Sequence, residues 1–418
     1  MAADALMRRV DLALLTPEER RSLVTRSAVP SDEVRREAAR IVEDVRRGGD
    51  VMLATLGERL GGGTGERVPA ADLAAAASAL DPALREAIET AAANVRAVHA
   101  DQVPGPRSVE PVPGVVVERR WAPLRRVGCY VPGGRAPLPS TLVMTVVPAR
   151  AAGVASIAVA TPAREDGSVD PVVLGAAGLL GIDEVWAMGG AQAVAALAYG
   201  TGTIDPVQKI VGPGNAWVTA AKVLVSGEVS IDMPAGPSEA LVLADASADP
   251  RFVAADLLAQ AEHGEDSPVV LVADEAAVAD AVLAEVEQMV PALERSDTIR
   301  RALTGHGLVV VAPDRDEAIR FADEFAAEHL SIHLADPAIA AEQITGAGSV
   351  FVGPWAPEPI GDYASGANHV LPTGGLAVSL GPLATEDFGS WRQVQTLTRD
   401  GLEELRPTVA ALAAAEGL

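Results

Sequence analysis

The side chains best suited to chemistry in this chain are an amide and an imidazole placed close together. Gln260 and His263 are three residues apart in a segment with helical apolar spacing, so both leave the same face near the helix end. An amide oxygen beside an imidazole nitrogen is a reasonable half of a metal site. The alternative is a histidine favoured near a helix C-terminus by the helix dipole, beside a solvated glutamine.

The rest of such a site could come from residues 349–375, a long segment rich in Gly and Pro that contains Asp362 and His369. Polar side chains in long loops are more often functional than those in a packed core. Gln260, His263 and Asp362 together would carry one negative charge, so bound zinc would keep positive charge and room for substrate, unlike a closed structural site. The alternatives are an Asx turn at Asp362 and a loop hydrogen bond at His369.

Two further sets of residues could act as a base or as a nucleophile. Glu328 and His329 are adjacent at an expected helix end, and histidine suits the role of a general base near neutral pH. The alternative for this pair is an exposed charged helix terminus. Cys129 is the only cysteine and could act as a nucleophile, but no histidine lies nearby in the sequence. We therefore expect Cys129 to be a small buried apolar side chain.

The elements that must position these residues alternate between short apolar strands and helices from residue 151 onward. This pattern predicts right-handed parallel βαβ units. The expected fold is α/β, with two doubly wound, incomplete Rossmann-like parallel-sheet domains and small helical segments at both ends. The expected strands are 155–161, 184–190, 208–215, 241–245, 269–274 and 308–313. The expected divisions are an arm (1–25), a main catalytic domain (26–130 with 237–381), a second Rossmann-like domain on the cofactor side (131–236) and a C-terminal helical tail (382–418).

A nucleotide-binding signal follows one of these strands. The stretch 212–217 (GPGNAW) lacks the third glycine of the dinucleotide fingerprint. Its backbone near Gly212 and Gly214 could still approach a phosphate at a helix N-terminus. No acidic residue can be singled out for the ribose, so the residues alone do not choose between NAD and NADP.

Bulk properties exclude several classes of protein. A chain of 418 residues with 49% apolar residues predicts a large core divided among two or more domains. A formal charge of −24 argues against binding to nucleic acid or to anionic membranes. The N-terminus lacks a signal-peptide core, and no run of about 18 apolar residues suggests a membrane span. A cytoplasmic protein without an internal disulfide is expected.

The segments 236–239 (GPSE) and 261–267 (AEHGEDS) resemble the central signature of the histidinol dehydrogenase family. Five further segments are similar to that family and occur in its order, so the resemblance spans most of the chain. They are 128–134 (GCYVPGG), 189–201 (GGAQAVAALAYGT), 211–218 (VGPGNAWV), 328–330 (EHL) and 361–375 (GDYASGANHVLPTGG). The resemblance implies an aldehyde-dehydrogenase-like fold. It also implies zinc- and NAD-dependent oxidation of L-histidinol through L-histidinaldehyde to L-histidine, the last step of histidine biosynthesis.

The resemblance also implies roles for individual residues. His329 would accept the proton and Glu328 would help to activate water. The implied zinc ligands are Gln260, His263 and Asp362, joined by a histidine near the C-terminus of the other subunit, and the implied NAD contacts are Tyr130, Gln192 and Asn215. The implied substrate contacts are Ser238, Gln260, His263, His329, Asp362, His369 and Glu416.

The position of Glu416 in the C-terminal tail implies a homodimer with shared sites and one zinc ion per subunit. The similarity to the family continues without interruption to Leu418. The zinc-binding histidine that the family has near its C-terminus would lie just beyond that residue, so we expect the natural chain to continue. Two alternatives remain open. One is a related dehydrogenase acting on another polyol or hydroxy-sulfonate, which would be expected to lose His369 and Glu416. The other is a non-catalytic dimeric scaffold.

Overall fold

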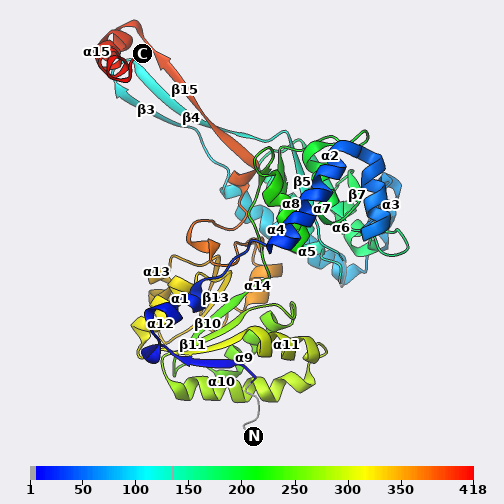
Figure 1. The fold of residues 1–418 in the computed structure, drawn as a ribbon, viewed down its shortest axis with the longest axis vertical. Coiled ribbons are helices and arrows are strands. Elements are labelled where there is room, and N and C mark those ends of the chain that lie inside the picture. Colours follow the sequence, from blue (N-terminus) through cyan, green and yellow to red (C-terminus); the bar gives the residue numbers. More distant parts are fainter. Residues whose placement is uncertain (1–5, 134–135) are drawn as a thin grey trace.

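The computed structural model describes residues 6–133 and 136–418. Two α/β lobes are each built on a six-stranded sheet, and an arm with a three-stranded antiparallel sheet projects away from them (Figure 1). Both lobes have helices on the two faces of the sheet, as the alternating pattern of strands and helices predicts.

The first lobe is built on sheet A, whose strands run in the order β1-β12-β11-β10-β13-β14. All neighbouring strands pair in parallel, and β10, β11 and β13 are buried along their whole length. Continuous burial of this kind is typical of a parallel sheet covered on both faces. The strands are β1 (Arg8–Asp11), β10 (Ala240–Ala244), β11 (Val269–Ala273), β12 (Gly307–Val311), β13 (His329–His333) and β14 (Ser349–Val352).

Helices cover both faces of sheet A. One face packs on α9 (Pro250–Ala261), α10 (Ala276–Met289) and α11 (Ser296–His306). The other face packs on α12 (Arg315–Phe325), α13 (Pro337–Gln343) and α1 (Pro17–Val24). β1 belongs to sheet A, so part of the expected N-terminal arm is a strand of this lobe.

Helix α9 begins as its sequence predicts, with Asp249 as N-cap accepting from the Arg251 amide and Pro250 in the first position. Helices α9 and α12 each follow a strand and return antiparallel to it, so both end at the amino edge of sheet A. Helix α12 ends at Ala326, which has a left-handed backbone (φ 53°). The segment between Ala326 and β13 therefore turns sharply at this edge.

The second lobe is built on sheet B, in the order β2-β7-β6-β5-β8-β9. Its parallel part winds in the same order as β12-β11-β10-β13-β14 of sheet A, which confirms the doubly wound fold. The strands are β2 (Glu66–Arg67), β5 (Arg126–Tyr130), β6 (Ser156–Thr161), β7 (Val185–Ala187), β8 (Lys209–Val211) and β9 (Ser230–Ile231). The winding reverses between β5 and β8, where doubly wound sheets bind ligands at the carboxyl ends of the strands.

Helices also cover both faces of sheet B. One face packs on α3 (Ala70–Ala79), α4 (Pro82–Asp101), α5 (Pro139–Ala151) and α6 (Pro171–Leu179). The other face packs on α2 (Asp32–Leu60), α7 (Gly190–Tyr199) and α8 (Ala216–Val225). Helix α2 bends at Gly49 (φ 53°, ψ −138°). A second helical segment follows that bend.

The division of residues between the lobes differs from the expected one. The segment 26–130 was expected to join 237–381, but β5 is a central strand of sheet B. Helices α2, α3 and α4 pack against α7, α6 and α5, respectively. The reason is that their apolar faces complete the two hydrophobic cores on either side of sheet B.

The arm is formed by strands that are distant in the sequence. β15 pairs with β4 in antiparallel register from Gly389 opposite Pro123 to Leu397 opposite Val115. β3 pairs with the other edge of β4, and α15 lies at the far end of the arm (Figure 1). The elements are β3 (Arg107–Val112), β4 (Val115–Pro123), β15 (Gly389–Leu397) and α15 (Arg399–Glu416).

The Gly- and Pro-rich segment 349–375 is more regular than its composition suggests, because it contains β14 and the short helix α14 (Glu358–Tyr363). Single 3-10 turns occupy Leu12–Leu14, Val290–Ala292, Leu376–Val378 and Thr385–Phe388. In the part of the chain that the structure describes, we find no helix long and apolar enough to cross a membrane.

Candidate active site

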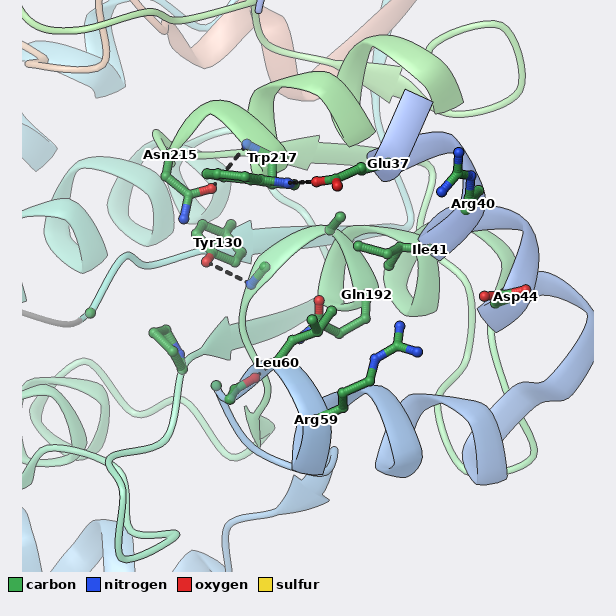
Figure 2. A pocket seen from close by; sticks show the side chains of 16 residues that line it. Glu37, Arg40, Ile41, Asp44, Arg59, Leu60, Tyr130, Gln192, Asn215 and Trp217 are labelled. Carbon is green, nitrogen blue, oxygen red and sulfur yellow. Dashed lines mark hydrogen bonds between the residues drawn. The ribbon is translucent and has the colours of Figure 1, made fainter. Parts of the chain in front are cut away.

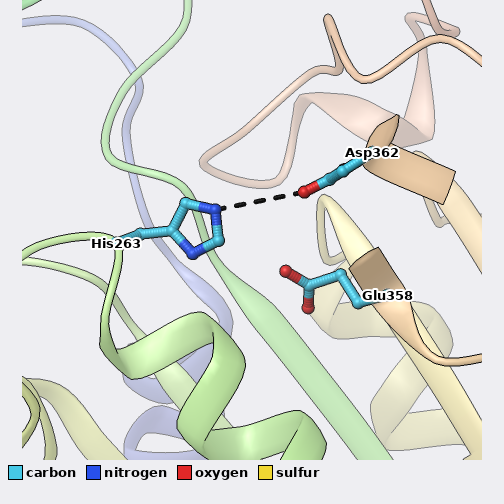
Figure 3. Close-up of side chains that lie close together, drawn as sticks. All are labelled: His263, Glu358 and Asp362. Atoms are coloured by element: carbon cyan, nitrogen blue, oxygen red, sulfur yellow. Dashed lines mark ion pairs between the residues drawn. The ribbon is translucent and has the colours of Figure 1, made fainter. Parts of the chain in front are cut away.

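A group of possible metal ligands lies between the end of α9 and helix α14. His263 lies just beyond the end of α9, and Glu358 and Asp362 lie one turn apart on α14 (Figure 3). His263 Nε2 is 4.0 Å from Asp362 Oδ2. One ligand atom from each of the three residues lies within 4.8 Å of the others. The structure thus brings His263 and Asp362 together as expected, and adds Glu358.

Gln260 lies three residues before His263 and is fully buried. Its Nε2 donates to the Ser238 carbonyl oxygen at 2.8 Å, whereas its Oε1 is buried without a hydrogen-bond partner among the described residues. A buried acceptor without a partner is costly, and a cation would satisfy it. His263 Nδ1–H donates to the Ala259 carbonyl oxygen at 3.0 Å, which leaves Nε2 facing Asp362. A ring nitrogen fixed in this way is typical of metal-binding histidines, so these residues fit a divalent cation.

Glu328 is held in place by the strand beside it. Ala240 of β10 is in register with His329 of β13, so the residues preceding the two strands are neighbours. The Ser238 hydroxyl donates to Glu328 Oε2 at 2.6 Å, and the Glu239 amide donates to the same oxygen at 2.8 Å. Two donors on one oxygen fix the carboxylate at the amino edge of sheet A.

His329 lies between carboxylates and is only 3% exposed. Its Nε2 is 3.4 Å from Asp362 Oδ1. Its Nδ1 is 3.7 Å from Glu328 Oε2 and 3.9 Å from Glu358 Oε1. The two ring nitrogens therefore face different carboxylates, and the ring joins the Glu328 side of the site to the Asp362 side.

Burial and mutual charge shift the acidities of this group. Burial raises the pKa of Glu328 to about 7, although His329 and Ser238 oppose the change. Burial also raises the pKa of Glu358 to about 8. For His329, burial lowers the pKa, but the neighbouring carboxylates, led by Glu328, outweigh it and raise the pKa to about 10. For Asp362, burial opposes the effect of His329, and the pKa is lowered overall. Shifts of this size are typical of functional sites.

His369 joins the site to the other lobe. Its Nδ1–H donates to the Asp362 carbonyl oxygen at 3.0 Å, and its Nε2 is 3.4 Å from the Thr141 hydroxyl on α5. Burial lowers the pKa of His369, against the effect of Asp362. Glu416, by contrast, is exposed at the end of α15 on the projecting arm, away from α9 and α14 of the same chain (Figure 1).

A cavity of about 680 Å³ lies at the carboxyl edge of sheet B, where the winding reverses (Figure 2). Tyr130, Gln192 and Asn215 all line it, so the three residues expected to contact NAD are brought together. The Gly190 amide donates to the Tyr130 hydroxyl at 3.1 Å, and Gln192 Nε2 donates to the Gly61 carbonyl oxygen at 3.2 Å. The Asn215 side chain caps α8 by accepting from two backbone amides.

The loop that carries Asn215 is fixed by buried charges. Gly212 has a φ of 112°, and a Cβ there would lie 2.1 Å from the Tyr130 carbonyl oxygen, so only glycine fits. The buried Lys222 forms an ion pair with Asp232 and donates to the Gly212 carbonyl oxygen at 2.9 Å. Asp232 in turn accepts from the Gly212 amide at 2.7 Å. This network holds the loop against the end of β5.

Sequence reasoning missed several residues of both sites. Helix α2 supplies Glu37, Arg40 and Arg59 to the cavity, with Arg40 and Arg59 on either side of the bend at Gly49 (Figure 2). Trp217 also lines the cavity, and its Nε1 donates to Glu37 at 3.3 Å. No local pattern identifies them, because α2 meets α7 and α8 only in the folded chain. The four-residue spacing of Glu358 and Asp362 was a usable signal for Glu358.

Cys129 is fully buried in β5, and burial raises the pKa of its thiol to about 12. A thiol in this state supplies almost no thiolate near neutral pH, and the thiolate is the nucleophile. Cys129 is therefore a small buried side chain, as expected.

Comparisons with known proteins agree over nearly the whole chain. A family profile described as histidinol dehydrogenase matches residues 24–418. The histidinol dehydrogenase of Methanothermobacter thermautotrophicus is 47% identical over 95% of this chain and 93% of its own length. That of Halobacterium salinarum is 48% identical over 97% of this chain and 96% of its own.

Solved structures show the same relationship. The crystal structure of histidinol dehydrogenase from Elizabethkingia anophelis superposes with a TM-score of 0.94 at 36% identity, covering 100% of this chain and 96% of that one. An acetylating aldehyde dehydrogenase from Geobacillus thermoglucosidasius shares only the fold, with a TM-score of 0.50 at 12% identity over 91% of this chain and 97% of that one. With its fold, its buried imidazole–carboxylate site and these relatives, the chain belongs to the histidinol dehydrogenase family and is an oxidoreductase.

Proposed function

We propose that this chain oxidises L-histidinol through L-histidinaldehyde to L-histidine, with NAD as hydride acceptor and one zinc ion per subunit. The observation that carries the proposal is the position of His329 Nε2, 3.4 Å from a carboxylate oxygen of Asp362. This places a candidate base directly beside the candidate metal ligands. A base beside the metal ligands could take the hydroxyl proton of an alcohol that the metal holds in place.

Gln260, His263 and Asp362 would hold the zinc ion. The unpartnered Gln260 Oε1 and the oriented His263 Nε2 support this choice. The ion would supply a positively charged template that accepts neutral nitrogen donors, which histidinol offers in its imidazole and amine. A cation at Asp362 would also offset part of the negative field that raises the pKa of His329, and so favour the neutral imidazole that a base requires.

The chain's own residues would move the protons. In the first step His329 Nε2 would accept the hydroxyl proton of the alcohol while hydride leaves the adjacent carbon for NAD. In the second step Glu328 would help to activate the water that adds to the aldehyde, and a second NAD would take the hydride from the resulting hydrate to give the carboxylate. Its carboxylate is already oriented by Ser238 and Glu239, and a pKa of about 7 suits reversible proton transfer near neutral pH.

The cavity of sheet B would bind NAD through Tyr130, Gln192 and Asn215. It lies where a doubly wound sheet binds nucleotides, and its lining combines aromatic rings, exposed backbone and two arginines. His369 contacts α5 of sheet B, so the site proposed for the substrate lies against the lobe proposed for the cofactor. This arrangement supports hydride transfer between the two.

Ser238 and His369 would contact the substrate from within the chain, and Glu416 would reach it from a second copy. Within one chain Glu416 lies far out on the arm (Figure 1), and α15 exposes Leu402, Val409 and Leu412. These features support a homodimer with shared sites. The proposal also places the enzyme in the cytoplasm, where a biosynthetic enzyme with one buried cysteine would work.

The decisive experiment compares His329→Ala with His306→Ala, which removes an exposed imidazole on α11. His329→Ala should lower turnover of L-histidinol by at least about 10²-fold, the contribution of a general base. It should retain zinc, because His329 is not among the proposed ligands. Near-normal NADH formation in that variant would contradict the proposal. Faster turnover of small diols than of histidinol by the unmodified enzyme would favour another substrate.

A further inference from the structure

Glu358 has no role in the reaction described above, yet the burial of its carboxylate is energetically unfavourable. It is 1% exposed, and both of its carboxylate oxygens lack a hydrogen-bond partner among the described residues. Burying a carboxylate without a partner is costly, so its retention here calls for a neighbour that uses the charge.

The nearest such neighbour is His329, whose Nδ1 lies 3.9 Å from Glu358 Oε1. Neither nitrogen of the buried His329 ring has a hydrogen-bond partner among the described residues. Glu328 Oε2 is similarly near to Nδ1, at 3.7 Å, but it already accepts from the Ser238 hydroxyl and the Glu239 amide. Glu358 is therefore the carboxylate that is available to accept a hydrogen bond from Nδ1–H.

The packing around Glu358 leaves it little freedom to move elsewhere. The Phe351 ring lies 6.1 Å from the His329 ring, centroid to centroid, at an interplanar angle of 34°. A Cβ at Gly361 would lie 2.6 Å from Phe351, so helix α14 approaches Phe351 as closely as only glycine permits. Helix α14, with Glu358 at its first position, is thus packed against Phe351, whose ring lies beside that of His329.

We propose that Glu358 is a positioning residue for His329, accepting the hydrogen bond from Nδ1–H so that the lone pair of Nε2 faces the substrate. This rests on the proposed role of His329 as base. When the alcohol O–H bond breaks and an Nε2–H bond forms, Glu358 keeps its negative charge and stabilises the imidazolium. It takes no proton itself. An imidazole whose distal nitrogen bonds to a buried carboxylate is the recurring way to fix the tautomer of a histidine base.

The alternative for Glu358 is a direct bond to the metal, since its oxygens lie near those of Asp362 and near His263. Metal content separates the two roles. A positioning residue leaves zinc affinity almost unchanged when it is replaced, whereas loss of a ligand weakens it strongly.

The experiment uses Glu358→Gln and Glu358→Leu in the full-length, zinc-loaded enzyme, with Glu262→Gln as the matched control. Glu262 is an exposed carboxylate next to His263 that does not approach His329. Glu358→Leu should lower kcat by about 10²-fold or more, the scale of losing an oriented base, and Glu358→Gln by less, because its amide oxygen still accepts from Nδ1–H. The KM for L-histidinol and the zinc content should stay within about twofold of the parent, because Glu358 is proposed to contact neither the substrate nor the zinc ion.

A second measurement does not depend on turnover. NMR of the histidine ring nitrogens in the unmodified zinc enzyme should show His329 protonated on Nδ1, and this signature should change in Glu358→Leu. An Nε2–H tautomer in the unmodified enzyme, loss of zinc from Glu358→Gln, or a kcat equal to that of Glu262→Gln would each overturn the proposal. If His329→Ala itself retained full activity, the proposed function would fail instead, so the two failures are distinguishable.

Discussion

Asp362 faces two different histidines with its two carboxylate oxygens. Oδ1 lies 3.4 Å from His329 Nε2, and Oδ2 lies 4.0 Å from His263 Nε2. His329 begins a strand of sheet A, whereas His263 lies just beyond the end of a helix that covers that sheet. One carboxylate on α14 thus connects the proposed base with the proposed metal ligands, and its loss should affect both.

Asp362→Asn should therefore lose zinc as well as activity. We expect zinc affinity to fall by more than about 100-fold. Loss of a residue that only hydrogen-bonds to a metal ligand costs up to about 100-fold, and loss of a ligand itself should cost more. Competition with a chromogenic chelator measures this affinity, and Asp266→Asn, an exposed aspartate near His263, is the control. Removal of zinc from the parent enzyme should abolish turnover, and added zinc should restore it. Full zinc binding by Asp362→Asn would count against the ligand set.

Cys129→Ala should retain turnover within about twofold, because a group that is not a nucleophile contributes no covalent step. Burial raises the pKa of this thiol to about 12, so it stays protonated from pH 7 to 9. Alkylation of the native enzyme should consequently stay slow throughout that range. An accessible thiol with a pKa of about 8.5 would instead react several-fold faster as the pH rises through that value. Loss of turnover in a folded Cys129→Ala would restore Cys129 as a candidate nucleophile.

Arg26→Ala should destabilise the protein by about 3–5 kcal/mol, because it leaves the carboxylate of Glu239 buried without its partner. Arg26 forms two hydrogen bonds with Glu239 at 2.9 and 2.8 Å and stacks on Phe325 at 3.4 Å. Glu239 is 2% exposed.

The chain offers a close control for this stability measurement. Arg46 pairs with Glu228 through two bonds and stacks on Tyr199, but both charged side chains are about half exposed. Arg46→Ala should cost less than about 1 kcal/mol, as exposed pairs do. Urea unfolding followed by circular dichroism compares the stability of the two variants. Equal losses of stability would show that burial does not account for the larger contribution expected of the Arg26–Glu239 pair.

Arg59→Ala should raise the KM for NAD by about tenfold or more, the value of a lost charge-assisted hydrogen bond, and leave the KM for histidinol unchanged. Arg59 lies in the cavity of sheet B, where its positive charge can meet the cofactor's phosphates (Figure 2). Arg47→Ala is the control, because Arg47 is exposed on the same helix and pairs with Glu43. An unchanged KM for NAD would remove Arg59 from the proposed cofactor site.

Val409→Asp should weaken the proposed homodimer, because an added charge on a buried apolar contact costs several kcal/mol. Val409 is 61% exposed in the single chain and lies on α15 with Leu402 and Leu412. Sedimentation velocity should show a shift toward monomer together with loss of activity. Val51→Asp, at a valine on α2 that is 76% exposed, should neither shift the protein toward monomer nor lower activity. A fully dimeric Val409→Asp would mean that this face of α15 is not the contact.

The sheets and most of the site were predictable because their signals are local. Strands such as 240–244 are continuous apolar runs, and a parallel sheet covered on both faces requires that pattern. The spacing of Gln260 and His263 places both on one helix face whatever the fold. Their meeting with Asp362 was expected only from the family resemblance.

The parts that were missed depend on contacts between distant segments. β15 consists mostly of exposed residues, and it is a strand only because β4 lies beside it. The apolar faces of α2 to α4 are equally suited to either sheet, so their sequence does not reveal which lobe they join. The burial of Glu358 is likewise set by how α14 packs on Phe351, which no local pattern encodes.

The direction of the two helices that end at the amino edge of sheet A has a consequence for the reaction cycle. The C-terminus of a helix carries a partial negative charge, and α9 and α12 both end at the edge of the sheet that holds the proposed catalytic residues. The backbone would thus favour a cation there, such as the proposed metal ion. The same partial charges would disfavour the carboxylate that the proposed oxidation creates, and so favour release of the product.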